Sequence, residues 1–229
     1  MDYLSDIELY YSLPENCGEE IILTDDEFKH AFRVMRHRLG DILFITNGEG
    51  KIFSAKIVET SKEQFKLSLE KTFTYINNFD NIHFCIPKLK NPERFEFALE
   101  KCVELGITNF LIFESERTIS TSSKLERWNK IALSAMKQSL RSFLPKISLI
   151  DSVKLINELA GEKIIFDQKS ENQFGNLKRN PKENFYFLFG PEGGFTEKEL
   201  QLFDKQQIFK LTENRLRSET AIIKCASML

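Results

Sequence analysis

The fold of this chain is decided by the stretch Phe185-Tyr-Phe-Leu-Phe-Gly-Pro-Glu-Gly-Gly-Phe-Thr-Glu-Lys-Glu199. Its first five residues are apolar, too few for a helix, and they predict a strand that is covered on both faces. The glycines that follow predict a sharp turn that another group can approach closely. Thr196 and Glu199 match a capping box, which predicts a helix that begins at Glu197. Because ligands of open α/β sheets bind outside the carboxyl ends of strands, this turn is a candidate binding loop.

The spacing of the glycines excludes two nucleotide-binding motifs. A P-loop needs Gly-x-x-x-x-Gly-Lys-Ser/Thr, but Phe195 stands where the second glycine would follow Gly190. A dinucleotide fingerprint needs Gly-x-Gly-x-x-Gly, and position 192 is Glu. Glu192 would also repel a phosphate, so a nucleoside ligand with a positive centre fits better. On this loop alone, an ordinary strand-to-helix turn remains the alternative.

A second motif, near the C-terminus, helps to interpret the glycine loop. Leu211-Thr-Glu-Asn-Arg-Leu-Arg-Ser-Glu-Thr-Ala221 follows a short predicted strand, Gln207 to Leu211. Together with Gly190-Pro-Glu-Gly-Gly194, this motif resembles the SPOUT methyltransferases, and more narrowly the RsmE family, which methylates a uridine of 16S ribosomal RNA. The family usually has Gly where Thr212 stands and Arg-Ile/Val in place of Asn214-Arg215, so the shape of this loop is expected to differ in detail.

The resemblance extends over nearly the whole chain. Further matching segments are Glu104-Leu-Gly106, Ser115-Glu-Arg117, Gln138-Ser139 with Arg141 and Pro145, and His30 with Val34, Arg36 and Gly40-Asp41.

Composition sets broad limits on the class of protein. With 229 residues, 41% of them hydrophobic and 29% charged, the chain is typical of a soluble globular protein of one large or two small domains. No run is long enough to span a membrane, and the acidic N-terminus argues against a signal or transit peptide. Four scattered cysteines and three histidines argue against a metal site or disulfides, so a cytoplasmic location is expected. The net charge of −2 means that RNA binding would require a local basic surface.

Residues 1–75 read as mostly strand. Asn47-Gly-Glu-Gly50 lies between two apolar runs, Asp41 to Thr46 and Lys51 to Val58, and predicts a hairpin. Further strands are expected at Glu20 to Thr24 and at Gln64 to Leu69. The pattern indicates a small curled β domain, and the resemblance implies that it is a PUA-like RNA-binding domain.

One helix is expected to interrupt these strands, from about Asp26 to His37. Phe28, Phe32, Met35 and Leu39 would form its apolar face, and the opposite face would carry Lys29, Arg33, Arg36 and His37. A one-sided basic stripe is either an electrostatic footprint for RNA or a plain solvated face. Arg141 could likewise reach a phosphate, or simply lie at the end of a helix.

Residues 76–229 alternate strands with helices, which predicts a mainly parallel α/β sheet. Helices are expected after Asn91-Pro92, ending at Gly106, and from Leu125 to Arg141. The terminal helix, Glu219 to Leu229, is apolar nearly all round and should be buried, in the core or against another subunit. The remaining strands are expected at Ile82 to Pro87, Asn109 to Phe113, near Ile147, Lys163 to Asp167, and Phe185 to Phe189. The resemblance further implies a C-terminal trefoil knot that binds the cofactor, and a homodimer.

The cofactor implied by the resemblance is S-adenosylmethionine. Three loops that follow strands could open on one edge of the sheet and hold it: 166–169, 190–195 and 211–216. The expected cofactor-binding residues are Phe166, Asp167, Gly190, Pro191, Glu192, Gly193, Gly194, Leu211 and Leu216.

The reaction that the resemblance implies is methyl transfer to N3 of uracil, which requires alignment of the two reactants and release of the N3 proton. Arg217 is the first catalytic candidate, since a guanidinium beside the cofactor loop can hydrogen-bond a developing oxyanion. The alternative is a structural ion pair with Glu219 or another acid. Glu219 is the second candidate, or it complements the helix dipole, and Ser218 is a possible N-cap.

The resemblance implies S-adenosylmethionine-dependent methylation of N3 of a specific uridine in 16S rRNA of the small ribosomal subunit. The expected enzyme is a homodimer that uses no metal and no membrane. Two alternatives remain open: methylation of another RNA, such as a tRNA ribose, and a non-catalytic ribosome-assembly factor. Cofactor affinity would separate the last from the others, and the modified nucleoside would separate the first two.

Overall fold

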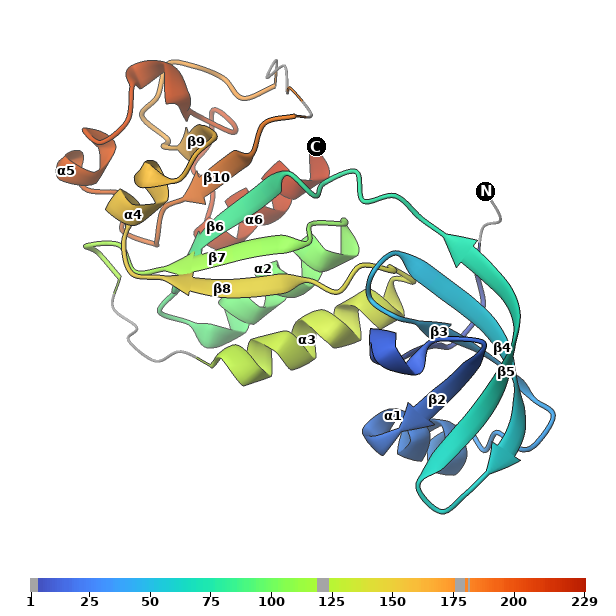
Figure 1. The fold of residues 1–229 in the computed structure, drawn as a ribbon. Helices are drawn as coiled ribbons and strands as arrows, with labels where there is room; N and C mark the ends of the chain where they lie inside the picture. The colour runs from blue at the N-terminus through green and yellow to red at the C-terminus, as the bar shows by residue number, and fades with distance from the viewer. Residues whose placement is uncertain (1–3, 119–123, 176–179, 181) are drawn as a thin grey trace. The chain divides into compact units, whose positions relative to one another are not determined.

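The computed structural model describes residues 4–118, 124–175, 180 and 182–229. Contacts divide the chain into two units, each of which is built on its own sheet (Figure 1). The first unit holds Met1–Asn78 and Ser134–Leu144, and the second holds Phe79–Leu133 and Pro145–Leu229. The division at residues 75 and 76 expected from the sequence stays a prediction.

The first unit contains a five-stranded sheet in the order β1-β3-β4-β5-β2. Its pairs are antiparallel except that β1 runs parallel to β3. The predicted hairpin at Asn47 is confirmed: the Asn47 side-chain oxygen accepts hydrogen bonds from the backbone N–H groups of Glu49 and Lys51. The strands are β1 (Leu9–Tyr11), β2 (Glu20–Thr24), β3 (Ile42–Thr46), β4 (Lys51–Thr60) and β5 (Gln64–Thr74), and a short 3-10 helix spans Pro14–Asn16. The weak β1 segment was missed in the sequence.

The predicted helix from Asp26 to His37 is wrong in its second half. The α-helix α1 covers Asp25–Lys29 and continues only as a π-helical turn, His30–Val34. The π turn changes the helical period, and Arg36 then takes a left-handed conformation with φ +63°. Phe28 is therefore buried and Phe32 packs partly against the same core, while Met35 and Leu39 are exposed instead of completing the apolar face.

The second unit contains a six-stranded, fully parallel sheet in the order β11-β9-β10-β6-β7-β8. The predicted α/β fold with a mainly parallel sheet is confirmed. The strands are β6 (Ile82–Pro87), β7 (Asn109–Phe113), β8 (Lys146–Ile150), β9 (Glu162–Phe166), β10 (Phe185–Phe189) and β11 (Ile208–Phe209). Strand β10 is buried along its whole length, as its five apolar residues predicted. The trefoil knot stays a prediction.

Helices cover both faces of this sheet. On one face, α4 (Val153–Glu158) and residues around α5 (Glu197–Leu200) pack on Cys85, Ile165 and Leu188. Neighbouring strand residues such as Phe187 point to the other face, where α6 (Ser218–Ser227) contacts β10. Figure 1 shows α6 beside α2 (Pro92–Glu104), with which it packs.

Helix ends follow local sequence signals, with small differences. Asn91 caps α2 and Gly106, with φ +99°, follows its end, as expected. Helix α3 (Leu125–Gln138) stops three residues before the predicted Arg141, because Leu140 turns left-handed with φ +55°. The terminal helix α6 is buried on the side of Ile222 and Cys225. Sequence reasoning missed α4.

Candidate active site

Three loops meet at one edge of the parallel sheet. They follow β9, β10 and β11, which are adjacent and parallel, so their carboxyl ends lie together. The loops surround a cavity of about 720 Å³, a volume in the range of roughly 300–1,000 Å³ that small-molecule sites occupy. All nine residues expected to bind the cofactor line this cavity, as do Arg217 and Glu219. The roles of these residues stay predictions.

Hydrogen bonds hold the three loops to one another. The backbone N–H of Asp167 donates to the carbonyl of Phe209 at 2.9 Å. The side-chain amide of Gln168 donates to the carbonyls of Thr212 and Glu213, at 3.0 and 3.1 Å. The predicted strand Gln207 to Leu211 is shorter than expected, because only Ile208–Phe209 pairs with β9 and a 3-10 turn, Lys205–Gln207, precedes it.

Ser218 ties the third loop to the second. Its hydroxyl donates to the carbonyl of Gly190 at 2.7 Å. The interpretation of Ser218 as the N-cap is wrong, since Arg217 occupies the cap position and Ser218 is the first helical residue of α6.

The glycines of the 190–195 loop meet different surroundings. A Cβ at position 190 would lie 3.2 Å from the Cα of Gly194, so the loop's own backbone would crowd it. A Cβ at position 193 would lie 3.2 Å from Cδ of Arg117. Gly194 has φ +68°, and a Cβ there would meet nothing within 4 Å. Gly194 is therefore the glycine that leaves free space in the cavity wall.

The loop after β7 braces the glycine loop. Arg117 donates to the carbonyls of Gly193 and Phe195, at 2.6 and 3.3 Å. The capping box of α5 is confirmed, and the same Glu199 carboxylate also accepts from the backbone N–H of Glu116 at 3.0 Å. The Ser115-Glu-Arg117 motif marked this loop in the sequence, but its contact with residues 193–195 depends on the fold.

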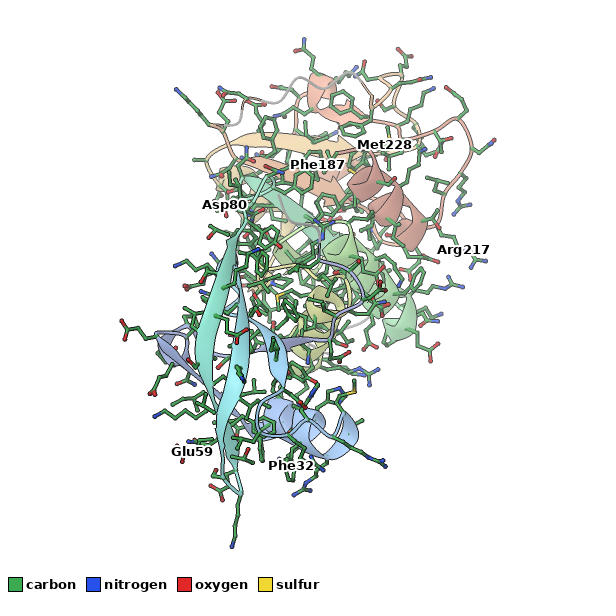
Figure 2. All side chains as sticks on the ribbon, turned by 90° about the vertical axis from the view of Figure 1, so that its right-hand side faces the viewer. Phe32, Glu59, Asp80, Phe187, Arg217 and Met228 are labelled. Atoms are coloured by element: carbon green, nitrogen blue, oxygen red, sulfur yellow. The ribbon has the colours of Figure 1, made fainter. Side chains whose placement is uncertain are left out.

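Arg217 lies where α6 begins, at the outer edge of the second unit (Figure 2). Its side chain is exposed and makes no hydrogen bond or ion pair with a residue of the described ranges. Glu219 instead lies 3.6 Å from Nε of Arg94, measured from Oε1, and its Oε2 is buried without a hydrogen-bond partner in those ranges. The alternative of an Arg217–Glu219 ion pair is thus wrong. Arg94 of α2 also lines the cavity, and nothing in the sequence singled it out.

The residues expected to bind RNA belong to the first unit. Lys29 forms an exposed ion pair with Asp26 at 3.0 Å. Arg33 and Arg36 are exposed on and after the π-helical turn, and Arg141 is exposed just beyond α3. Their role in RNA binding stays a prediction.

Burial shifts the pKa of several groups that do not line the cavity. Burial lowers the pKa of His83 and of Lys163, which occupy the amino-terminal ends of β6 and β9, opposite the edge that holds the loops. Near the cavity, a hydrogen bond from Lys210 lowers the pKa of the exposed Glu213 carboxyl. The described residues contain no group of three or more His, Cys, Asp or Glu side chains that could hold a metal ion. In the same ranges, no helix is long and apolar enough to cross a membrane.

Comparison with known proteins gives two family matches. Residues 77–229 match an RNA methyltransferase domain, and residues 23–70 match an RNA methyltransferase PUA domain. The chain is 37% identical to ribosomal RNA small subunit methyltransferase E of Mesomycoplasma hyopneumoniae, with 88% of this chain and 90% of that protein covered. It is 32% identical to the protein of the same name from Buchnera aphidicola, with 90% and 86% covered.

A solved structure shows the same fold. Ribosomal RNA small subunit methyltransferase E of Neisseria gonorrhoeae, crystallised bound to S-adenosyl methionine, superposes with a TM-score of 0.84 at 29% identity. The match covers 96% of this chain and 95% of that one. The PUA-like identity expected for the N-terminal sheet is confirmed by the family match.

Proposed function

The chain belongs to the RNA methyltransferase family that includes ribosomal RNA small subunit methyltransferase E, and from this premise we propose that it methylates N3 of a specific uridine in 16S ribosomal RNA. The methyl donor in this proposal is S-adenosylmethionine. The observation that carries the proposal is the cavity at the carboxyl edge of β9, β10 and β11, which is lined by the loops that the sequence motifs predicted. The relative from Neisseria gonorrhoeae, which has the same fold, binds this cofactor.

The cavity walls fit a nucleoside with a positive centre. Gly194 leaves open a space that a Cβ would fill. Phe166 and Phe189 lie at the ends of their strands and give the wall apolar surface, while the loop backbone supplies donors and acceptors for a base and a ribose. Asp167 and Glu192 line the same cavity, and their negative charge suits a ligand that carries a sulfonium centre. We assign the nine loop residues from Phe166 to Leu216 to cofactor binding on these grounds.

The cofactor, when bound, supplies an electrophilic methyl group. The protein must hold N3 of uracil in line with that group and stabilise the charge that develops as the N3 proton leaves. The guanidinium of Arg217 is free of protein partners within the described ranges and lines the cavity, so it can donate to a uracil oxygen. Glu219, held beside Arg94, supplies a carboxylate in the same cavity that could accept the proton. Both residues are thus catalytic in this proposal.

The PUA-like unit provides the second part of the proposal. Lys29, Arg33, Arg36 and Arg141 are assigned to contacts with RNA, which a chain of net charge −2 can attract only through such local surfaces. The substrate is 16S rRNA or the small ribosomal subunit, and the enzyme acts as a homodimer in the cytoplasm, where that RNA is found.

One experiment tests the proposed reaction. The purified protein is incubated with S-adenosylmethionine labelled in its methyl group and with 16S rRNA or small subunits from cells that lack the gene, and the RNA is digested and analysed by mass spectrometry. We expect one equivalent of 3-methyluridine, which is absent before the reaction. A labelled methyl group on a ribose, or transfer of the label to tRNA only, would favour the alternative in which another RNA is the substrate. Absence of cofactor binding in calorimetry would favour a non-catalytic assembly factor.

A further inference from the structure

A basic groove adjoins the active-site cavity. It has a volume of about 710 Å³ and lies over the start of α2, where Lys90, Arg94, Lys124 and Arg127 line it. Arg94 also lines the cavity itself, so the two hollows share a wall. None of these four residues carries a role in the sequence motifs or in the reaction proposed above, except that Arg94 holds Glu219.

The groove continues along the start of α3. A further hollow of about 490 Å³ shares Lys124 and Arg127 with the groove and adds Lys130, which forms an ion pair with Glu126 of the same hollow at 2.9 Å. The cavity, the groove and this hollow are therefore joined in succession by shared residues. Hollows that adjoin one another along the surface suit an extended polymer better than a compact ligand.

Three acids also line the groove, Glu93, Glu96 and Glu192, and Glu93 is exposed with no ion pair to another described residue. Glu96 forms an ion pair with Arg127, in which Nη2 donates to Oε2 at 2.6 Å and Nε lies 2.6 Å from Oε1. Glu192 accepts a hydrogen bond from the backbone N–H of Lys90 at 3.0 Å. The ammonium groups of Lys90 and Lys124 are exposed, and no ion pair joins them to another described residue. With four basic and three acidic side chains the lining is positive by one formal charge, and the two lysine ammonium groups are the charges free to meet an external anion.

The anion must be held by side chains rather than by the end of the helix. Asn91 already accepts hydrogen bonds from the N–H groups of Glu93 and Arg94, at 2.8 and 3.4 Å, so these donors are satisfied within the protein. Lysines on flexible stems act as point charges that suit backbone phosphates and carry no base specificity.

We propose that this groove holds the phosphodiester backbone of the RNA strand that flanks the target nucleotide. The proposal rests on the proposed function, because it requires one nucleotide of that strand to enter the cavity. The groove then sets the path of the neighbouring phosphates, with Lys90 and Lys124 as the principal contacts. The PUA-like unit supplies a separate RNA surface.

The test is a pair of double variants. Lys90→Ala with Lys124→Ala removes two groove charges and leaves the backbone contact of Lys90 with Glu192 in place. Lys146→Ala with Lys154→Ala removes two exposed lysines of the same unit that do not line the groove, and is the matched control. For both we would measure RNA affinity against salt concentration, steady-state methylation of protein-free 16S rRNA and of small subunits, and S-adenosylmethionine affinity by calorimetry.

We expect the groove variant to raise KM for both RNA substrates by about tenfold and to reduce the log–log salt slope by roughly 0.7 for each lost contact with single-stranded RNA. Its kcat at saturating RNA and its cofactor affinity should match those of the control. If the two double variants have equal KM values and equal salt slopes, the groove proposal is overturned. The proposed function would still stand in that case, provided that the wild type methylates the RNA. A defect seen with subunits but not with protein-free rRNA would also overturn it, since the groove would then contact a ribosomal protein. A wild type that methylates neither RNA would instead refute the proposed function.

Discussion

The guanidinium of Arg117 donates a hydrogen bond to the carbonyl oxygen of Gly193 at 2.6 Å, although the two residues are 76 positions apart in the chain. The aliphatic part of the same side chain occupies the space beside Gly193, where a Cβ would lie 3.2 Å from Cδ. The absence of a side chain at position 193 therefore makes room for Arg117, and Arg117 in return fixes the carbonyls of the glycine loop. The segment that follows β7 thus holds the glycine loop in place through Arg117.

Replacing Arg117 should loosen the loop without unfolding the protein. Arg117→Ala removes the charged donor to Gly193 and Phe195, and since the side chain is exposed we expect only part of the roughly 1.5–3 kcal/mol of a charged hydrogen bond to be lost. Affinity for S-adenosylmethionine, measured by calorimetry, should fall by about 5- to 10-fold. Gly193→Ala should weaken binding in the wild type and have little further effect once Arg117 is gone. Independent, additive losses in this double-mutant cycle would show that the two residues do not act together.

Gly194 offers a sharper test of the cofactor site. Its φ of +68° disfavours a β-branched residue, and its missing Cβ faces open space in the cavity. Gly194→Val should abolish detectable S-adenosylmethionine binding in calorimetry. Gly40→Val is the matched control, because Gly40 also has a positive φ and free space around its Cβ but lies in the first unit. Both variants should lose some thermal stability from backbone strain, about 1–2 kcal/mol. A folded Gly194→Val protein that binds cofactor as well as the control does would remove this loop from the site.

Local signals in the sequence explain why much of this fold could be predicted. The apolar run of β10, the capping box of α5 and the Asn91 cap each depend on residues that are close together in the sequence. All three are confirmed. The helix after Asp25 shows the limit of the same reasoning. A pattern of apolar residues at helical spacing cannot reveal a π turn, so Met35 and Leu39 were assigned to a buried face that the backbone does not form.

The candidate site, too, could be predicted from the sequence only in part. The loops after β9, β10 and β11 could be predicted because parallel strands bring their carboxyl ends to one edge. Arg94 could not, since it reaches the cavity only because α2 packs against α6, and that contact depends on the tertiary fold. The distinction between Gly193 and Gly194 is likewise absent from the sequence, where the two glycines look equivalent.

The proposed homodimer can be tested by substitutions at α2 and α6, the two helices that pack together. Phe97 of α2 is 50% exposed and Met228 after α6 is 41% exposed, and such apolar side chains are candidates for a subunit interface. Light scattering should give a mass near twice 26.7 kDa. Phe97→Lys with Met228→Lys should shift the mass toward the monomer, whereas Leu13→Lys with Ile76→Lys, which also removes two exposed apolar residues, should not. A wild type that stays monomeric at micromolar concentration would contradict the proposed dimer.

The basic residues of the first unit predict a second contribution to RNA affinity. Losing Arg33 and Arg36 together should weaken RNA binding and reduce the log–log salt slope by roughly 0.7–0.9 for each phosphate contact. Affinity for S-adenosylmethionine should not change, since neither residue lines the cavity. Lys56→Ala with Lys62→Ala removes the same charge from exposed positions of the same unit and is the control. A salt slope equal to that of the control would assign the arginines to a solvated surface.

Substitutions of Arg217 test the proposed methyl-transfer step. It lies at the N-cap of α6, lines the cavity and has no partner within the described ranges, so nothing in those ranges requires it for folding. If its guanidinium stabilises the charge on uracil as the N3 proton leaves, Arg217→Ala should lower the single-turnover rate of methylation by ~100-fold or more, as loss of a preorganised donor does. Arg217→Lys should recover only part of this loss, because an ammonium lacks the planar fork.

The binding steps separate a catalytic role from a structural one. Cofactor affinity of Arg217→Ala should stay near that of the wild type, because the loop backbone makes those contacts in our proposal. Thermal unfolding should also be unchanged, since the side chain is exposed. Lys205→Ala, which removes a positive charge from the segment before β11 without touching the cavity, is the control for general electrostatics. If Arg217→Ala instead weakens cofactor binding or lowers the unfolding temperature while turnover at saturating substrates persists, the side chain supports the loop. The charge on uracil must then be stabilised by another donor in the cavity, for which Arg94 is the next candidate.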